Sequence, residues 1–421
     1  MKAVAAVLLA LLLMPMTIAA AEPGPDDLMK GFPPLSRNQV TRQNWLDAPF
    51  HRWGFKHVES LLPTVAVDRG DAPVSVLAAA PAAAAPASME DFSFTDPWQK
   101  SRDLAAFLAD QHVDALLVWH DGALIAEHYE NGQTRRTRHV MFSVTKSFTG
   151  LIAEMLIHEG RLDETRKVSA YLPELAGSAY QDASVRNLLD MEVGIAFSEV
   201  YDDPGSDIAR YTYAAGLRPA PPGVDHEPSL YDYLPTLDKR GEHGVDFHYV
   251  TANTEVLGWL LERVTGTSFA ELFEQRLYQG VGAERDALIM VDPRGKAVAG
   301  GGLSITARDA LRLAVVLARE GRHGETQVVP RAVVAKIAGG GTPRPSLWGN
   351  EQSMDNSYRS QWYVHHPSKT FSAAGVHGQN IYIDPAADVV VVIQSTYPEA
   401  DGEFFAVNGA FFQAMVAHLA R

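Results

Sequence analysis

Residues 141–150 constrain this chain more than any other stretch. They read Met-Phe-Ser-Val-Thr-Lys-Ser-Phe-Thr-Gly, and the residues that follow Ser143 are apolar at helical intervals. This pattern predicts a buried helix that begins at about Ser143. Because residues three apart lie on one face of a helix, Ser143 and Lys146 are predicted to be neighbours. The apolar positions are Phe148, Leu151, Ile152, Met155 and Leu156.

A serine and a lysine at this spacing suggest nucleophilic catalysis. A lysine that loses water in a pocket has a lowered pKa, so its amine can accept the serine proton near neutral pH. The unpaired N–H groups at the start of a helix would favour an oxyanion beside the serine. The alternative is an exposed serine and a solvated lysine, because Ser-x-x-Lys is a short pattern. The apolar helix after it and a hairpin before it favour catalysis.

Composition bounds the class of protein. The chain has 421 residues, of which 46% are hydrophobic, so it can bury a large core in one big domain or in two to three smaller ones. Its formal net charge of −15 argues against nucleic acid or an anionic membrane surface as a partner. It contains no cysteine, which excludes disulfides and thiolate metal sites.

The first residues have the features of a secretory signal. Lys2 precedes an apolar run, and the small residues that end at Ala21 suit cleavage there, so we expect residues 1–21 to be a signal peptide. A membrane-anchoring helix is the alternative, but Pro15 interrupts the run, which is also short for a membrane span. We therefore expect a periplasmic or secreted protein without a stable membrane anchor after cleavage.

The chain up to about residue 129 divides into an arm, a linker and a hairpin. Residues 22–96 combine prolines with aromatic residues and end in an Ala/Pro-rich stretch, which predicts an extended arm followed by a linker. Residues 98–108 have a helical pattern. Residues 113–120 and 123–129 flank Asp121-Gly122, which is a strong signal for a β-hairpin.

The rest of the chain predicts a helical region and then a second hairpin. Residues 163–285 contain short helical patterns, and within them the tyrosine- and proline-rich residues 201–235 suit a substrate-facing loop. Further predicted features are a helix over 254–266 stopped by Gly266, a closely packed glycine triplet at 300–302, a helix capped by Thr306, strands at 380–384 and 388–394, and a helix from about Glu403.

These elements predict an α/β (α+β) fold. Hairpins near opposite ends of the chain can join into one antiparallel sheet that is flanked by N- and C-terminal helices. The inserted, mostly helical lobe at about residues 163–285 would pack beside that sheet, within a domain spanning residues 97–421. Ser143 would then lie where the two lobes meet, and clefts between lobes are common ligand sites.

The stretch from Ser143 to Lys146, together with Tyr249 downstream, resembles the serine β-lactamase and penicillin-binding-protein family. The chain resembles the class C and esterase branch of this family, and most of all the hydrolases of 6-aminohexanoate (nylon) oligomers. This resemblance covers the chain from about Gly31 to the C-terminus. It implies a β-lactamase/transpeptidase-like fold and a serine hydrolase that forms an acyl-enzyme. No cofactor is implied.

The family's second motif is Tyr-x-Asn. Tyr249 matches its tyrosine, and a phenol beside an ammonium can relay a proton between the serine and the leaving group. The alternative is a buried structural aromatic residue. Thr251 stands where the family has asparagine or serine, and is a candidate substrate-binding residue, whereas Asn253 is two residues late and suits a local turn or cap.

The family's third motif, Lys/His-Thr-Gly, is incomplete. Its place is taken by Ala373-Ala374-Gly375, so the cation that would hold a β-lactam carboxylate is missing. A backbone role remains, because the N–H groups of Val376 and Ser143 could form the oxyanion hole. Gly375 and His377 are candidate substrate contacts; His377 could equally be a structural histidine in a glycine-flanked turn.

Two further features bear on substrate binding and on metal binding. Tyr201, in Val200-Tyr201-Asp202, resembles the tyrosine that a loop of the nylon-oligomer hydrolases brings over the substrate, although an exposed turn tyrosine is an equal alternative. His365 and His366 are adjacent, so in a strand they would point to opposite faces. We therefore predict no metal site and no metal cofactor.

The resulting hypothesis is a serine hydrolase of small carboxylic esters or amides. Ser143 would attack, Lys146 would be the base and Tyr249 would carry the proton. The alternatives are a β-lactamase or D-alanyl-peptide hydrolase, and a non-catalytic envelope-binding protein of the same fold; the missing cation weakens the former and supports the latter. The expected partner is a small ester or amide, not nucleic acid; the sequence leaves the oligomeric state open.

Overall fold

The computed structural model describes residues 24–80, 89–343 and 354–420. The predicted signal peptide at 1–21 and part of the Ala/Pro-rich stretch, at 81–88, lie outside the described residues. Within the described ranges, no helix has both the length and the apolar character that crossing a membrane requires.

The largest element is a seven-stranded antiparallel sheet with the order β11-β12-β13-β14-β15-β4-β5. It joins the two predicted hairpins, because β15 pairs with β4 with Val392 opposite Leu117. The prediction of one antiparallel sheet built from both ends of the chain is therefore confirmed. The strands are β4 (Val113–His120), β5 (Ala123–Tyr129), β11 (Asn356–Arg359), β12 (Trp362–His365), β13 (Thr370–Gly375), β14 (Gln379–Asp384) and β15 (Val389–Ser395).

Helices cover both faces of this sheet. The terminal helices α2 (Leu104–Asp110) and α11 (Phe404–Leu419) pack together on one face, where the rings of Phe107 and Phe411 stack 4.0 Å apart. On the other face, α9 (Ala307–Ala318) lies against β14, β15 and β4. Thr306 caps α9 as predicted, its side chain accepting a hydrogen bond from the Asp309 N–H.

The predicted start of the helix over residues 98–108 was wrong. Residues Ser101–Asp103 form strand β3, which pairs with β2 (Ser93–Thr95), and the helix begins only at Leu104. The Asp103 carboxylate accepts a hydrogen bond from Ala106 N (2.7 Å), which caps the helix at that point. A local cap and a tertiary strand pairing therefore outweighed the helical pattern of the preceding residues.

A second, four-stranded sheet has the order β1-β7-β8-β6, and its strand β6 ends directly before Met141. The N-terminal arm supplies its edge strand, β1, which pairs with β7. The arm is also anchored by Trp45 and Phe55, which are fully buried in the main core. The elements are β1 (Thr64–Val67), β6 (Arg138–Val140), β7 (Ala287–Met290), β8 (Leu303–Thr306), and, in the arm, η1 (Pro25–Asp27), η2 (Ser36–Asn38), α1 (His51–Gly54) and η3 (Val58–Ser60).

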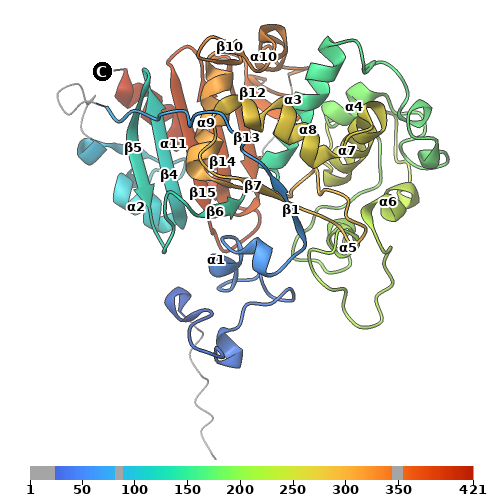
Figure 1. The fold of residues 1–421 in the computed structure, drawn as a ribbon, viewed down its shortest axis with the longest axis horizontal. Helices are drawn as coiled ribbons and strands as arrows, with labels where there is room; N and C mark the ends of the chain where they lie inside the picture. The colour runs from blue at the N-terminus through green and yellow to red at the C-terminus, as the bar shows by residue number, and fades with distance from the viewer. Residues whose placement is uncertain (1–23, 81–88, 344–353, 421) are drawn as a thin grey trace, which may run out of the picture.

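The region between residues 163 and 285 is a mostly helical lobe beside the large sheet (Figure 1). Residues 201–235, expected as a loop, include two short helices, α5 and α6. The lobe contains η5 (Val168–Ala170), η6 (Pro173–Leu175), α4 (Val185–Leu189), α5 (Asp207–Ala214), α6 (Leu230–Tyr233), η7 (Leu234–Thr236), α7 (Thr251–Thr265), α8 (Phe269–Arg276) and η8 (Tyr278–Val281). The remaining elements are η4 (Met89–Asp91), β9 (Arg322–His323), β10 (Thr326–Gln327), α10 (Arg331–Ala338) and η9 (Val376–Gly378).

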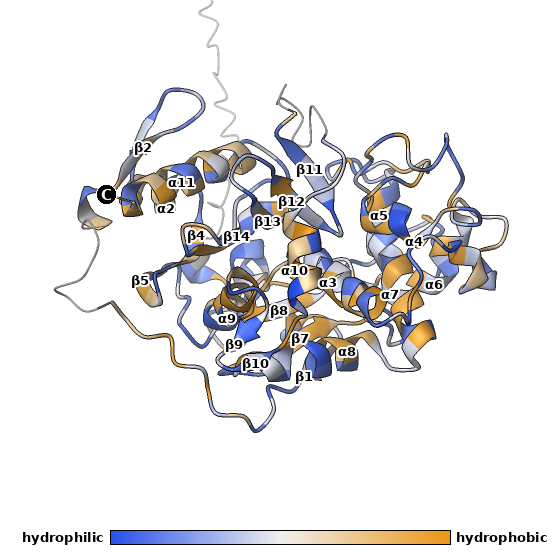
Figure 2. Cartoon of the chain, turned by 90° about the horizontal axis from the view of Figure 1, so that it is seen from above, coloured by the Kyte–Doolittle hydropathy of each residue, from blue (hydrophilic) through white to orange (hydrophobic). Residues whose placement is uncertain are grey.

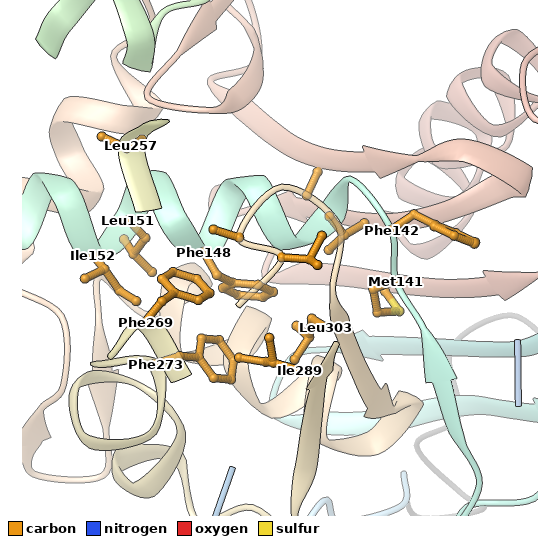
Figure 3. Packing of buried hydrophobic residues seen from close by; sticks show 14 of the residues in the cluster. Met141, Phe142, Phe148, Leu151, Ile152, Leu257, Phe269, Phe273, Ile289 and Leu303 are labelled. Atoms are coloured by element: carbon orange, nitrogen blue, oxygen red, sulfur yellow. The ribbon is translucent and has the colours of Figure 1, made fainter. Parts of the chain in front are cut away.

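Helix α3 (Val144–His158) runs between the lobe and the sheet, and its residues 144–156 are all buried. Phe148 packs edge-on against Phe273 of α8 and Trp362 of β12, with ring centroids 5.7 and 6.2 Å apart. Figure 3 shows Phe148 and Leu151 facing Phe269 and Phe273. Helix α7, which is apolar along much of its length, packs beside α3 (Figure 2). The first turns of α3 are therefore held by the helical lobe on one side and by the large sheet on the other.

Candidate active site

Ser143 follows a tight turn between strand β6 and helix α3. Phe142 adopts a left-handed backbone conformation (φ 43°), which is uncommon for a bulky side chain. Its ring is held between Phe55 (centroids 4.8 Å apart) and Trp45 (6.2 Å). The backbone just before it is also fixed, because Met141 N donates to Leu303 O (2.8 Å). The turn presents Ser143, the N-cap of α3, to a cavity while its neighbours stay buried.

Lys146 is brought into contact with Ser143, as the helical spacing predicted. Its Nζ donates to Ser143 Oγ (2.9 Å) and to Gly300 O (2.7 Å). The side chain is buried, with 1% of its surface exposed. Burial lowers the pKa of Lys146, because the charged ammonium loses its hydration there. A larger fraction of Lys146 is therefore a neutral amine near neutral pH than for a solvated lysine.

Tyr249 lies two residues before helix α7 and is the third member of a group with Ser143 and Lys146. The Nζ of Lys146 is 5.4 Å from the centre of the Tyr249 ring. Burial raises the pKa of the Tyr249 phenol, and a hydrogen bond with Ser143 partly offsets that rise. The phenol is therefore protonated at neutral pH and able to donate. Tyr358 and Tyr363 of β11 and β12 flank its ring.

The end of strand β13 packs against the backbone of Ser143. A Cβ atom placed on Gly375 would lie 2.7 Å from Met141 O and 3.2 Å from Ser143 N, so only glycine allows this approach. Val376 follows and lines the same cavity as Ser143. It is the first residue of η9, so its N–H has no acceptor within that turn. The structure thus brings together the two amides predicted to form an oxyanion hole.

His377 does not supply the missing cation. Its Nδ1–H donates to Tyr397 O (2.8 Å), and its ring packs 5.0 Å from that of Phe55. Burial lowers the pKa of His377 to about 3, so its imidazole is neutral at physiological pH. It lines the cavity. Its hydrogen bond to Tyr397 and its ring contact with Phe55 are contacts typical of a structural histidine, which is the alternative to a substrate contact.

The other two candidate substrate contacts, Tyr201 and Thr251, meet at a carboxylate that sequence reasoning missed. Glu199 accepts hydrogen bonds from the Tyr201 hydroxyl (3.0 Å) and the Thr251 N–H. All three residues line the cavity. Asn253 points elsewhere, since its side-chain amide contacts Met191 Sδ (3.4 Å). Nothing in the local sequence around Glu199 marked it, because its partner Thr251 is 52 residues away.

Glu255, on α7, is a second missed residue. It is 2% exposed and accepts hydrogen bonds from the backbone next to Lys146, at Ala299 N (2.9 Å) and Gly300 N (2.8 Å). The glycine triplet at 300–302 therefore serves close packing, as predicted. A Cβ atom on Gly300 would lie 2.8 Å from Glu255 Oε1, and one on Gly302 would lie 2.7 Å from Val298 O.

The cavity next to Ser143 has a volume of about 780 Å³. Besides the residues around Ser143, Thr251, Gly300 and Val376, its walls include the N-terminal arm, the segment from Glu199 to Arg218, and residues 398–401. Carboxylates outnumber cations among the lining residues. The carboxylates are Asp47, Glu199, Asp202, Glu399 and Asp401, and the cations are Lys146 and Arg218.

The arginine in this wall is already paired. Arg218 Nη2 donates to Asp47 Oδ1 of the arm (2.6 Å). The arm is held there by Trp45, whose indole N–H donates to Leu217 O (2.7 Å). Among the described residues, no group of three or more histidine, aspartate or glutamate side chains is placed to hold a metal ion.

Comparison with known proteins identifies the family. The sequence model of the Beta-lactamase family matches residues 102–410. The chain belongs to the β-lactamase family. The chain is also similar to a 6-aminohexanoate-dimer hydrolase of Paenarthrobacter ureafaciens, with 36% identity over 374 residues, covering 88% of this chain and 91% of the relative. The resemblance drawn from the two motifs is therefore confirmed.

Solved structures of the family confirm the fold. A Bacillus anthracis protein, provisionally named a 6-aminohexanoate-dimer hydrolase, superposes with a TM-score of 0.83 at 28% identity, covering 91% of this chain and 98% of that chain. A class C β-lactamase from Rhodobacter sphaeroides has a TM-score of 0.55 at 16% identity, covering 75% and 98%, and shows the fold alone. This β-lactamase-family protein is accordingly a serine hydrolase of esters or amides.

Proposed function

We propose that Ser143 is the nucleophile of this β-lactamase-family hydrolase and that it forms an acyl-enzyme with small carboxylic esters or amides. The observation that carries the proposal is the contact between Lys146 Nζ and Ser143 Oγ (2.9 Å) at the start of α3, beside a cavity large enough for a small substrate. The group has the roles that nucleophilic catalysis requires: a nucleophile, a desolvated base and a second proton carrier.

The reaction would run through two acyl transfers. Neutral Lys146 accepts the Ser143 proton while Oγ attacks the substrate carbonyl, and the resulting oxyanion accepts hydrogen bonds from the N–H groups of Ser143 and Val376. Tyr249 passes a proton to the leaving alcohol or amine as its bond to carbon breaks, and the ammonium of Lys146 returns the Ser143 proton to Tyr249, so that both groups regain their starting states. Water then attacks the acyl-enzyme in the same way, which releases the acid and restores the serine hydroxyl.

The charges of the cavity favour neutral substrates over carboxylates. His377 is neutral, and Arg218 is paired with Asp47, so neither offers a free cation to a substrate carboxylate. An unpaired carboxylate in a partly dry cleft costs several kcal/mol. We infer that neutral short-acyl esters are better substrates than penicillins or D-alanyl peptides. The relative named as a 6-aminohexanoate-dimer hydrolase supports aminohexanoate-type amides as a minor activity.

The test compares Ser143→Ala with the wild type on p-nitrophenyl butyrate. The variant should lose turnover by at least about 10³-fold, because removing the nucleophile leaves only binding and oxyanion stabilisation. An unchanged thermal unfolding midpoint would show that the fold is intact. Retained turnover in the pure variant would disprove the role of Ser143.

A non-catalytic binding protein is the rival, and the missing third-motif cation is the feature in its favour. A fluorophosphonate probe separates the two functions. Stoichiometric labelling of Ser143, read by mass spectrometry, supports the hydrolase, whereas folded protein without label supports the binding protein. Comparing kcat/KM for the butyrate ester, a chromogenic cephalosporin and the linear aminohexanoate dimer then defines the substrate class.

We also propose that the protein is exported to the periplasm or secreted. The support is the sequence of residues 1–21, with an apolar run and small residues at the expected cleavage point. Expression of the full chain in a Gram-negative host, followed by N-terminal sequencing of the periplasmic fraction, tests this. A mature protein that begins at Glu22 supports export, and an uncleaved cytoplasmic protein contradicts it.

A further inference from the structure

We propose that Glu255 is a positioning residue that orients Lys146 through the backbone of Gly300. The inference rests on the proposed function, because it concerns how the base is aimed at Ser143. Glu255 lies on α7, one turn after Thr251, and its side chain points at the glycine triplet and not at the cavity, which it does not line.

Both oxygens of Glu255 are used in holding two different elements. Oε1 accepts from Gly300 N (2.8 Å) and from the Tyr211 hydroxyl of α5 (2.6 Å). Oε2 accepts from Ala299 N (2.9 Å). A carboxylate can satisfy these three donors at once because it offers only acceptors. It therefore connects α7 to α5 and to the segment that passes over Lys146.

Gly300 links this carboxylate to the base. Its N–H is held by Glu255, and its carbonyl accepts the hydrogen bond from Lys146 Nζ at 2.7 Å. Residue 300 has no room for a side chain, since a Cβ atom would lie 2.8 Å from Glu255 Oε1 and 3.3 Å from Thr251 Cγ2. Glu255 thus fixes the position of the acceptor that Lys146 uses.

Fixing this acceptor matters because of the geometry of an amine. A neutral Lys146 has two N–H bonds and one lone pair, and the lone pair must face the Ser143 hydroxyl to accept its proton. An N–H bond directed at Gly300 O restricts the remaining directions. If Gly300 moved, the Lys146 amine could rotate away from Ser143, although every side chain of the site would still be present.

Glu255 also acts on Lys146 by charge. Its carboxylate favours the ammonium form of Lys146 and opposes the effect of burial on the pKa. Burial raises the pKa of Glu255 itself, and the hydrogen bonds from Tyr211, Gly300 and Ala299 oppose that rise by favouring its charged form. The other titratable groups that interact with this pair include Glu199, Tyr249, Tyr211, Tyr180 and Tyr231.

The matched test compares Glu255→Gln with Glu262→Gln. Both residues lie on α7, about 10 Å apart along its axis at 1.5 Å per residue. Glu262 likewise holds a tyrosine hydroxyl, of Tyr231 (2.9 Å), and a backbone amide, Phe269 N (3.0 Å). It also pairs with Lys296 Nζ (3.2 Å), but none of these three contacts is made to Lys146 or to Gly300. In Glu255→Gln one acceptor oxygen becomes an NH₂ group, which then faces either the Ala299 N–H or the Gly300 N–H and the Tyr211 hydroxyl.

We expect Glu255→Gln to lower kcat/KM for p-nitrophenyl butyrate by at least about 30-fold, as expected for a misplaced catalytic group, while Glu262→Gln stays within threefold of the wild type. The acid limb of the kcat/KM profile should also move to lower pH in Glu255→Gln alone, because Lys146 loses a favourable negative charge. Glu255→Asp, which keeps the charge, should return the acid limb toward its wild-type position.

The outcomes separate this inference from the proposed function. If wild-type protein shows no ester turnover and no fluorophosphonate label, the proposed function fails. If the wild type is active but Glu255→Gln matches Glu262→Gln in rate and in pH profile, the positioning role is wrong. If Glu255→Gln folds poorly, Glu255→Asp is compared with Glu262→Asp. A larger loss of kcat/KM in Glu255→Asp supports the positioning role, and an equal loss in both variants overturns it.

Discussion

Replacing Gly375 by alanine should separate strand β13 from the nucleophile. The backbone of Gly375 is extended (φ −138°, ψ 154°), which alanine adopts without strain, so the substitution acts only through its added methyl group. That methyl would lie 2.7 Å from Met141 O and 3.2 Å from Ser143 N, both of them backbone atoms. Relief requires the start of Val376 or the turn at Ser143 to move by a few tenths of an ångström or more.

The expected loss follows from what that movement does to the oxyanion hole. Donors must lie within about 2.7–3.1 Å of the oxyanion, and removing one such donor costs about 10²–10³ in kcat. We expect Gly375→Ala to lower kcat by about 10²-fold with a smaller change in KM, because the interaction is made mainly in the transition state. Overpacking of this kind should also destabilise the fold by about 1–3 kcal/mol.

The assay is kcat and KM for p-nitrophenyl butyrate, with thermal unfolding measured in parallel. Gly409→Ala in α11 is a matched control, since a Cβ atom there meets nothing within 4 Å and alanine suits a helix interior. This control should keep wild-type kcat. A Gly375→Ala variant with kcat within threefold of the wild type would refute the assignment of the Ser143 and Val376 amides as the oxyanion hole.

Two further predictions concern charge in the site. Because Lys146 acts as a base only when neutral, kcat/KM should rise with pH through its pKa and level off above it; a profile that is flat or falls between pH 6 and 9 would contradict this role. Asp47→Asn should free Arg218, so kcat/KM for p-nitrophenyl hemisuccinate relative to the neutral butyrate should rise by about 3- to 10-fold; an unchanged ratio would show that Arg218 does not reach the substrate.

Several features could be read from the sequence because they depend on residues close together in the chain. The contact of Ser143 with Lys146 follows from helical spacing, and the β4–β5 hairpin from Asp121-Gly122 between two β-rich runs. Even so, the sequence predicted a helix through Ser101, because its pattern could not reveal the pairing of β3 with β2. Local signals are reliable where no tertiary contact competes with them.

Other features of the site were settled only by packing between distant segments. Glu255 is 45 residues from Gly300, and the arm residue Asp47 is 171 residues from Arg218. The neutrality of His377 comes from burial, which no neighbouring residue in the sequence reveals. Residue identity and spacing therefore predicted the contact between the proposed nucleophile and its proposed base. The orientation of that base, the charge of the cavity and the place of the oxyanion hole depend on desolvation and long-range hydrogen bonds, which exist only once the chain has folded.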